Sequence, residues 1–316
     1  KEGIEAYFAK VNAAGGVFGR KLALRALDDG YDTEPAVANA HQLIEKDKVF
    51  ALIAFYGSSP SAAVLPVIEA ARVPLVGTVS GAGELRKPDN HYLFNVRASY
   101  ADETASIVQH LTTIGIRRVA VLYQDDGFGQ SGLKGVTEAL AQHKLAPVAT
   151  GSVARNSTDL GPAVTKIAGK DAQAVVMVTL YKATAEFIKR MRSAGESPMF
   201  VALSPVGTNN LIELLGAGKS TGIVVAQVIP RPWSDKAPLV REYKQSMASF
   251  RPNTAYSYFG LEGYVYAKLM TAALMRCGAN PTREKLVDAL HAGPFDLGGF
   301  RVNFKPGSNT GSTYVE

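Results

Sequence analysis

The sequence predicts an α/β protein of two lobes, each organised around a parallel β-sheet. Short apolar runs rich in Val, Ile and Leu alternate along the chain with longer segments whose apolar residues recur at helical spacing. The runs would supply about ten strands, more than a compact sheet usually holds. The length of 316 residues also exceeds that of one typical domain. We therefore expect two sheets with right-handed crossovers between their strands.

The elements begin with a helix in which Ile4, Phe8 and Val11 share one face. Alternating apolar residues in 19–27 predict the first strand. The acidic residues of 28–32 predict a solvated turn, because the remaining ligands of a calcium loop are missing. The predicted strands are 19–27, 49–56, 73–79, 91–97, 118–123, 146–153, 174–179, 199–203, 223–228, 300–304 and 313–315. The predicted helices are 2–14, 35–46, 100–111, 131–143, 160–168, 184–192, 238–249, 256–275 and 283–289, with another after Pro60.

Composition excludes several classes of protein. The chain has 47% hydrophobic and 20% charged residues, as ordinary globular proteins do. Its formal net charge is +6, but Lys and Arg are scattered and form no basic stripe typical of a nucleic-acid surface. No apolar run reaches the roughly 18 residues of a membrane-spanning helix. The single cysteine, Cys277, excludes a disulfide within the chain and argues against a structural metal site.

Two small-residue turns form the main candidate site. Gly-Ser-Ser-Pro at 57–60 follows one predicted strand, and Ser-Gly-Ala-Gly at 80–83 follows the next. Each turn presents a hydroxyl and backbone N–H groups beside a helix N-terminus, an arrangement that binds a carboxylate or a phosphate. Both turns would lie at the carboxyl ends of parallel strands, where ligands of such sheets bind. The alternative is that they are ordinary turns, which need small residues to reverse the chain tightly.

The sequence contains no complete enzyme motif. Gly127, Gly129 and Gly132 match the spacing of a dinucleotide fingerprint. However, Asp125 and Asp126 precede them where a pyrophosphate needs a neutral or positive rim, and no acidic residue stands about 20 positions later to hold a ribose. The histidines have no evident nucleophile or metal-ligating partner. We therefore expect a protein that is not an enzyme.

Aromatic residues stand at the ends of several predicted strands. Tyr56, Phe128, Tyr181 and residues 256–259 precede or follow turns that would face a ligand crevice. Such a crevice suits a small polar molecule with an apolar part. The alternative is that these rings cap the sheet edges and pack between the lobes.

The sequence resembles the type I periplasmic binding proteins of ABC importers, in the branch of the leucine/isoleucine/valine-binding protein. The resemblance covers nearly the whole chain in collinear order. The segments that carry it are GIEAYFAKVNAAGGVFGRKLALRALDDGYD, the GSS turn at 57–59, ARVPLVGTVSGAGELR, NVRASYADE, LYQDDGFGQSG, the junction of a strand with Tyr181, and LEGYVYAKLM. It implies two Rossmann-like lobes joined by three crossover strands. The first lobe would comprise residues 1–100 and 230–310, without the strand with which the family begins, and the second residues 101–229 and 311–316.

The resemblance also implies roles for residues of the first lobe. Ser58 and Ser80, with neighbouring residues such as Ser59, would hold the α-carboxylate of a ligand. Tyr56 would line the same wall. Gly81 stands where the family often has a hydroxyl.

On the second lobe, Phe128 and Tyr181 would close over the ligand. In the leucine/isoleucine/valine-binding branch, the relative that this sequence resembles uses a Glu to bind the α-ammonium of its ligand. The matching position in this chain is Ser204. Either another carboxylate supplies the charge or the ligand has no amine, because an unpartnered buried ammonium costs several kcal/mol. The candidate carboxylates are Asp102, Glu103, Asp126 and Glu262.

The implied protein is monomeric and periplasmic. It closes by hinge motion on an amino acid of branched-chain or other apolar type and delivers it to a membrane permease, without cofactor, metal or nucleic acid. No signal peptide is present, as expected of a mature exported chain. The alternatives are a binding protein for an aromatic or aliphatic carboxylate without an amine, and the ligand-sensing domain of a receptor.

Overall fold

A computed structural model describes residues 1–305 and 307–316 and divides the chain into two compact units. Unit 1 comprises Lys1–Ser80, Glu84–Ala98 and Ile229–Tyr314, and unit 2 comprises Gly81–Gly83, Ser99–Val228 and Val315–Glu316. The predicted α/β fold with two sets of parallel strands is confirmed. The observed division differs from the predicted lobe boundaries by a few residues and assigns the short stretch Gly81–Gly83 to unit 2.

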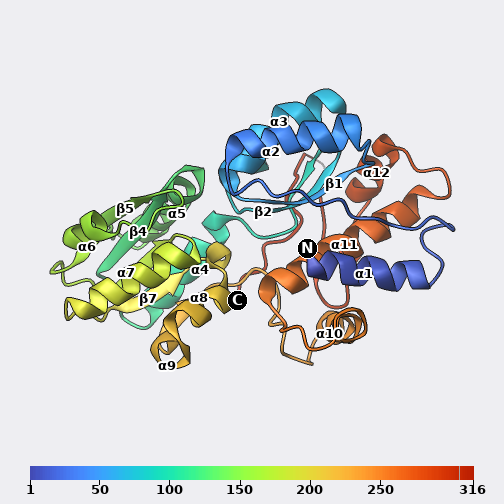
Figure 1. Ribbon diagram of the computed structural model, residues 1–316. Coiled ribbons are helices and arrows are strands. Elements are labelled where there is room, and N and C mark those ends of the chain that lie inside the picture. Colours follow the sequence, from blue (N-terminus) through green and yellow to red (C-terminus); the bar gives the residue numbers. More distant parts are fainter. Residues whose placement is uncertain (306) are drawn as a thin grey trace. The chain divides into compact units, whose positions relative to one another are not determined.

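Unit 1 is built on a three-stranded parallel sheet in the order β1-β2-β3. The strands are β1 (Leu52–Tyr56), β2 (Leu75–Val79) and β3 (Leu93–Phe94). Helices α2 (Thr33–His41) and α3 (Ser58–Ala71) lie on one face, and α1 (Glu2–Ala13) and α11 (Tyr258–Cys277) on the other (Figure 1). The unit also contains η1 (Gln42–Lys46), α10 (Pro238–Phe250), α12 (Arg283–His291), and the antiparallel pair β9 (Phe295–Asp296) and β10 (Arg301–Val302).

Strands β1 and β2 share a distortion at their centres. Their register runs from Ile53↔Val76 to Phe55↔Thr78, and the residues between these pairs, Ala54 and Gly77, have φ angles of +60° and +74°. A Cβ atom at Gly77 would lie 2.6 Å from the ring of Tyr266, so glycine is required there. Ala54 has a side chain in a backbone conformation that disfavours one.

The strand predicted at residues 19–27 is wrong. Residues 21–29 belong to no helix or strand, and only an isolated bridge joins Val17 to Arg20. The amide side chain of Asn12 takes the place of a strand partner at Leu22: Leu22 N–H donates to Asn12 Oδ1 at 2.7 Å, and Asn12 Nδ2 donates to Leu22 O at 2.8 Å. An alternating pattern becomes a strand only beside a second strand, and none of the described strands pairs with it.

Other boundaries are also corrected. The strand predicted at 91–97 shrinks to the two residues of β3, that at 223–228 shrinks to Ile223–Val225, and that at 313–315 is irregular. The pairing of β9 with β10 was not foreseen. The second turn was expected to stand beside a helix N-terminus, but only the four-residue 3₁₀ helix η2 (Gly83–Arg86) follows it.

Unit 2 is built on a five-stranded parallel sheet in the order β5-β4-β6-β7-β8. Its strands are β4 (Val119–Asp125), β5 (Ala149–Ala154), β6 (Ala174–Val178), β7 (Met199–Ala202) and β8 (Ile223–Val225). Its helices are α4 (Tyr100–Thr113), α5 (Gly127–Gln142), α6 (Gly161–Ile167), α7 (Tyr181–Ser193), η3 (Ser204–Val206), α8 (Thr208–Leu215) and α9 (Ala217–Ser220).

Successive side chains of β4 point to opposite faces of the sheet, and their contacts show which helices of unit 2 cover each face. Val119 and Val121 belong to a cluster with residues of α4 and α5, whereas Ala120 and Leu122 belong to a cluster with residues of α6, α7 and α8. A strand covered on both faces needs apolar residues at every position, which is why β4 and β6 read as continuous apolar runs.

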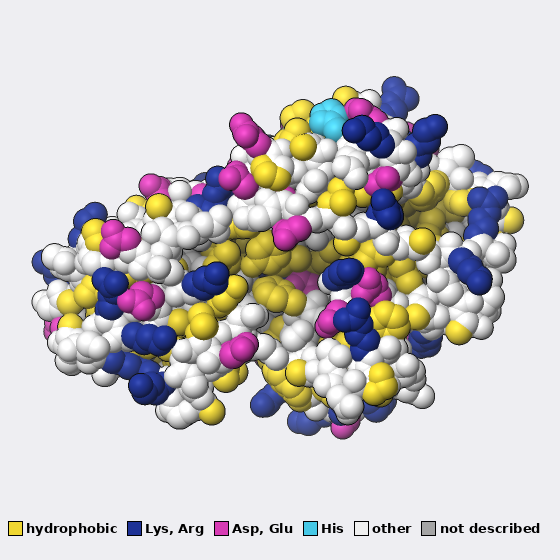
Figure 2. Space-filling model, viewed as in Figure 1, with side chains coloured by type: hydrophobic (Ala, Val, Ile, Leu, Met, Phe, Trp, Pro, Cys, Tyr) yellow, Lys and Arg dark blue, Asp and Glu magenta, His cyan; other side chains and the backbone are white. Residues whose placement is uncertain are grey.

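On the face shown in Figure 2, Lys and Arg lie scattered among Asp and Glu. Of the helices in the described part of the chain, none is both long enough and apolar enough to cross a membrane.

Candidate functional site

The two predicted turns of unit 1 bring their serines together. β1 and β2 are parallel neighbours, so their carboxyl ends lie at one edge of the sheet. Ser58 and Ser80, which are 22 positions apart, are fully buried, and their Oγ atoms lie 2.8 Å apart in a hydrogen bond. Ser58 and Ser59 are the first residues of α3, a helix of 14 residues. Two hydroxyls therefore lie beside a helix N-terminus, which attracts a negative charge.

Arg86 holds the backbone on which Ser80 stands. Its guanidinium donates to the carbonyl oxygens of Ser80 at 3.3 Å, Arg97 at 3.0 Å and Ala98 at 3.1 Å. Ser80 and Ala98 are each the last residue of a segment of unit 1. Sequence reasoning missed Arg86, because no local pattern shows that one side chain collects three distant carbonyls.

A buried polar network lies behind this turn. Arg97 forms two hydrogen bonds with Glu262, and Tyr266 donates its hydroxyl to the same carboxylate. Tyr266 Oη also lies 3.1 Å from the carbonyl oxygen of Thr78, whose own hydroxyl donates to Asn95 at 2.7 Å. Burial, followed by the charge of Glu262, raises the pKa of Tyr266 well above its usual value, so this phenol stays protonated. The carboxylate of Glu262 is thus bound by Arg97 and Tyr266 inside unit 1, so its role here is structural.

Aromatic rings line the carboxyl end of β1. Tyr56 is half-buried and contacts Tyr31 and Phe259 edge-on, with ring centroids 5.7 Å and 6.0 Å away. Edge-on contacts hold each ring in a fixed orientation. The predicted wall residue Tyr56 therefore lies in a preformed aromatic cluster at the end of the strand that precedes Ser58.

Gly81 follows Ser80 and belongs to unit 2. A Cβ atom at this position would lie 2.4 Å from Cδ1 of Tyr100, and the Tyr100 N–H donates to the Gly81 carbonyl at 2.7 Å. The close ring of Tyr100 leaves no room for the hydroxyl-bearing side chain that the resemblance would place here.

Ser204 forms hydrogen bonds with a carboxylate that is far away in the sequence. Both its backbone N–H and its hydroxyl donate to Glu103, at 2.8 Å and 2.9 Å. Glu103 is fully buried, and Ser204 nearly so. The two residues are 101 positions apart, so no local motif could have linked them. Of the candidate carboxylates, Glu103 is the one that contacts Ser204, the position that matches the ammonium-binding Glu of the relative.

Asp102 and Asp126 have capping roles instead. Asp102 closes a capping box with Ser99 at the start of α4. Asp126 accepts a hydrogen bond from Gly129 N–H at 3.1 Å at the start of α5 and another from Gln124 Nε2 at 2.7 Å. Both carboxylates thereby satisfy backbone donors that a helix N-terminus leaves unpaired.

Phe128 and Tyr181 occupy different settings in unit 2. Phe128 is 1% exposed and packs against Tyr100, with ring centroids 5.2 Å apart. Tyr181 begins α7 at the carboxyl end of β6 and is only partly buried. Tyr181 thus has the exposure that contact with a ligand requires, whereas Phe128 contributes to the core between α4 and α5.

The glycine pattern at 127–132 has a packing explanation. A Cβ atom at Gly129 would lie 1.7 Å from the carbonyl oxygen of Gln124, and one at Gly132 would lie 2.4 Å from Val178. These glycines let α5 approach β4 and β6 closely. In the described residues, no group of three or more His, Cys, Asp or Glu side chains could hold a metal ion.

Comparison with known proteins identifies the family. The sequence matches the periplasmic binding protein family over residues 1–315. An amino acid binding protein of Pseudomonas aeruginosa is 26% identical over 278 residues, which are 85% of this chain and 71% of that protein. The crystal structure of a possible leucine/isoleucine/valine-binding protein from Rhodopirellula baltica is 30% identical, with a TM-score of 0.94, over 99% of this chain and 86% of that chain.

A second solved structure leads to the same family. A substrate-binding periplasmic protein from Ralstonia solanacearum is 32% identical, with a TM-score of 0.94, over 100% of this chain and 90% of that chain. The paired parallel sheets and the collinear sequence agree with both structures. The chain therefore belongs to the periplasmic binding protein family and has the type I fold of its leucine/isoleucine/valine-binding branch.

Proposed function

We propose that this chain is the extracytoplasmic substrate-binding component of an ABC importer and that it binds an apolar amino acid for delivery to a permease. The observation that carries the proposal is the buried hydroxyl pair of Ser58 and Ser80 at the first turn of α3. Both hydroxyls are fully buried and lie 2.8 Å apart, so a ligand oxygen near one of them is also near the other. With the N–H groups of α3, this arrangement suits a carboxylate.

Glu103 is our candidate for the group that receives the ligand's ammonium. Its buried carboxylate accepts hydrogen bonds from the backbone N–H and the hydroxyl of Ser204, the position that matches the ammonium-binding Glu of the relative. A buried negative charge beside an ammonium would also offset the desolvation of both groups. Tyr56 and Tyr181 would contact the apolar side chain.

A carboxylate ligand without an amine is the second candidate. It is favoured by the structural roles of Asp102, Asp126 and Glu262, which cap helices or pair with Arg97. If Glu103 only positions Ser204, none of these four carboxylates would accept the ammonium of an amino acid.

A thermal-shift comparison of matched ligands tests the proposal. Leucine carries both charged groups, isocaproate keeps the same skeleton without the amine, and isoamylamine keeps it without the carboxylate. A ligand that binds the native state raises the unfolding midpoint by mass action. We expect a clear rise with leucine or another apolar amino acid, a smaller one with isocaproate and none with isoamylamine. Equal rises with leucine and isocaproate would support the second candidate, and a rise with isoamylamine alone would overturn the carboxylate site.

A further inference from the structure

Arg86 stands where the chain passes repeatedly between the two units. The chain leaves unit 1 after Ser80, returns at Glu84 and leaves again after Ala98. The points after Ser80 and Ala98 are here called the two exits. Arg86 is the last residue of η2, which begins just before the return and ends just after it. Its side chain therefore belongs to unit 1 and starts close to both exits in the sequence.

The guanidinium of Arg86 joins the two exits on the unit 1 side. Its Nη2 lies 3.3 Å from the carbonyl oxygen of Ser80, 3.0 Å from that of Arg97 and 3.1 Å from that of Ala98. Ser80 is the last residue before the first exit, and Ala98 is the last before the second. A guanidinium is planar and rigid, so it fixes its acceptors relative to one another more firmly than a flexible ammonium does.

The backbone of η2 has supports of its own. The carbonyl oxygen of Leu85 accepts a hydrogen bond from Asn95 Nδ2 at 2.8 Å and another from Asn309 Nδ2 at 2.9 Å. Asn95 also accepts the hydroxyl hydrogen of Thr78, on β2, at 2.7 Å. Arg86 therefore extends from a part of unit 1 that is held in place by other contacts than those of its guanidinium.

The two exits are also joined on the unit 2 side. Tyr100 N–H donates to the carbonyl oxygen of Gly81 at 2.7 Å. Gly81 is the first residue after one exit, and Tyr100 is the second residue after the other. Because Tyr100 is the first residue of α4, its N–H precedes the hydrogen bonds of that helix and uses Gly81 instead. Hydrogen exchange of this N–H therefore reports how firmly the two exits are held together.

We infer that Arg86 is a positioning residue for ligand binding. It holds Ser80 so that its hydroxyl meets the carboxylate of the ligand, and it fixes the spacing of the two exits, which would act as hinge segments when the units close. The inference rests on the proposed function, because it takes Ser80 as a ligand contact. A ligand at Ser80 thus binds a residue whose backbone is tied to both exits through one side chain.

The positive charge of Arg86 offers a different explanation for any effect on a carboxylate ligand. A lysine at this position keeps the charge, but its compact ammonium on a flexible stem cannot reproduce the geometry of the guanidinium. Arg86→Lys should therefore lose affinity if Arg86 positions Ser80, and should keep it if the charge alone matters. Arg86→Met removes both the charge and the donors.

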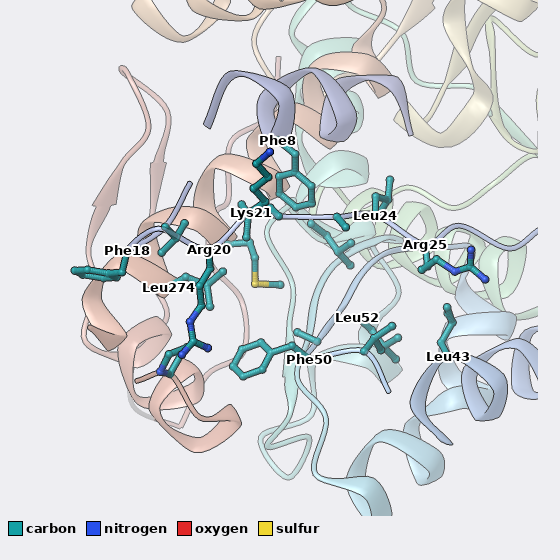
Figure 3. A pocket seen from close by; sticks show the side chains of 18 of the residues that line it. Phe8, Phe18, Arg20, Lys21, Leu24, Arg25, Leu43, Phe50, Leu52 and Leu274 are labelled. Atoms are coloured by element: carbon teal, nitrogen blue, oxygen red, sulfur yellow. The ribbon is translucent and has the colours of Figure 1, made fainter. Parts of the chain in front are cut away.

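Arg283 supplies a matched control in the same unit. Its guanidinium also donates to three backbone carbonyl oxygens, those of Val49 at 2.8 Å, Phe50 at 3.0 Å and Ala71 at 3.3 Å. These acceptors precede β1 or end α3, so they lie at the end of the sheet opposite to the serine pair. Figure 3 shows Phe50 beside an apolar groove of unit 1, and the lining of that groove includes neither serine of the pair nor Arg86.

The first measurement needs no ligand. We expect Arg86→Met to accelerate hydrogen exchange of the Tyr100 N–H by more than about fivefold, and Arg86→Lys to have a smaller effect. Arg283→Met should leave this exchange unchanged. Val148 N–H, which donates to Val119 O at 2.9 Å within unit 2, is the internal reference. Equal acceleration in Arg283→Met, or none in Arg86→Met, would overturn the claim that Arg86 holds the exits together.

The second measurement is calorimetric titration with leucine and isocaproate. Arg86→Met should weaken the ligand that binds by at least about fivefold. Arg283→Met should lower the unfolding midpoint without changing the affinity, since its contacts only stabilise the fold. In the Ser80→Ala background, Arg86→Met should add little further loss, because the hydroxyl that it positions is gone.

The outcomes separate this inference from the proposed function. Full affinity in Arg86→Lys would overturn positioning, and this comparison decides alone if Arg86→Met does not fold. Unchanged affinity in Arg86→Met beside a loss in Ser80→Ala would overturn the role of Arg86 and leave the proposed function intact. If neither Ser58→Ala nor Ser80→Ala changes binding, the carboxylate site fails and with it the role of Arg86 in binding, while the exchange of Tyr100 still decides whether Arg86 joins the exits.

Discussion

Arg97 and Glu262 form a buried ion pair with two parallel hydrogen bonds in unit 1. Arg97 Nε lies 2.8 Å from Oε1 and Nη2 lies 3.0 Å from Oε2, and the two side chains are 2% and 3% exposed. Tyr266 donates to the same carboxylate and joins the pair to β2 through Thr78. Residues of β2, of the loop after β3 and of α11 thus share one polar network beneath the turn that carries Ser80.

Removal of one partner of this pair should destabilise the protein strongly. We expect Glu262→Gln and Arg97→Met each to lower the free energy of unfolding by about 3–5 kcal/mol, because each leaves an uncompensated charge or donor in the interior. The double variant Arg97→Met with Glu262→Met should lose less than the sum of the single variants. Denaturant unfolding measures all three, and strictly additive losses would contradict a coupled pair.

Ser58 and Ser80 should contribute to ligand affinity rather than to folding alone. Ser58→Ala or Ser80→Ala should weaken carboxylate binding by about tenfold to a hundredfold, the range for a lost hydrogen bond to a charged group. Ser61→Ala is the matched control in α3, because Ser61 is also buried and its hydroxyl has no hydrogen-bond partner among the described residues. Calorimetric titration gives the affinities, and an equal loss in the control would remove the hydroxyl pair from the binding site.

Glu103→Gln should distinguish the two ligand candidates. If Glu103 receives an ammonium, the substitution should weaken leucine binding by at least about tenfold while isocaproate binding stays the same or improves. Asp102→Asn is the control, since Asp102 is the preceding carboxylate but caps α4. If Glu103→Gln weakens both ligands equally, Glu103 acts by positioning Ser204.

Ala54→Gly should stabilise the protein. Ala54 lies in β1 at φ +60°, where a side chain costs about 1–2 kcal/mol, and the greater freedom of glycine in the unfolded chain cancels part of this gain. We expect a net increase in the free energy of unfolding of up to about 1 kcal/mol. Ala51→Gly, just before the strand, should instead lower it by about 0.5–1 kcal/mol. Thermal or urea unfolding of the two variants checks the opposite signs.

Glu242 should make the stability of unit 1 sensitive to acid. Burial alone would raise the pKa of its carboxyl, but hydrogen bonds from Lys10 and Lys268 outweigh burial and lower the pKa below its usual value of 4.5. The resulting stabilisation is present above that value and is lost as the pH falls through the folded-state pKa. We expect Glu242→Gln to reduce the dependence of unfolding free energy on pH below about 4.5. An unchanged dependence would show that other carboxyls dominate.

The parts of the fold that could be predicted are those set by local pattern. β4 and β6 are covered on both faces, so their positions read as continuous apolar runs, and the parallel sheet rule brings the residues after β1 and β2 to one edge. Residues 19–27 show the limit of such reasoning. Their alternation is real, but the Asn12 side chain, rather than a strand, satisfies Leu22.

The polar contacts of the candidate site could not be predicted from the sequence either, because their partners are far apart along the chain. Glu103 reaches Ser204, and Arg97 reaches Glu262, across 101 and 165 positions. Such contacts depend on how helices pack on the sheets and leave no spacing that a motif could capture. Arg86 was missed because its partners are backbone carbonyls, which every residue has.

The segmented composition of the two units has a consequence for the order of folding. Most of unit 2 is one continuous stretch, Ser99–Val228, whose strands and helices meet neighbours close in sequence. Unit 1 must join Lys1–Ser80 to Ile229–Tyr314, so α11 can cover β1 and β2 only after a long loop has closed. Contacts between residues that are far apart in the sequence form slowly, so we expect unit 2 to acquire its native structure first. The folded unit 2 would then bring the two parts of unit 1 that flank it in the sequence close together.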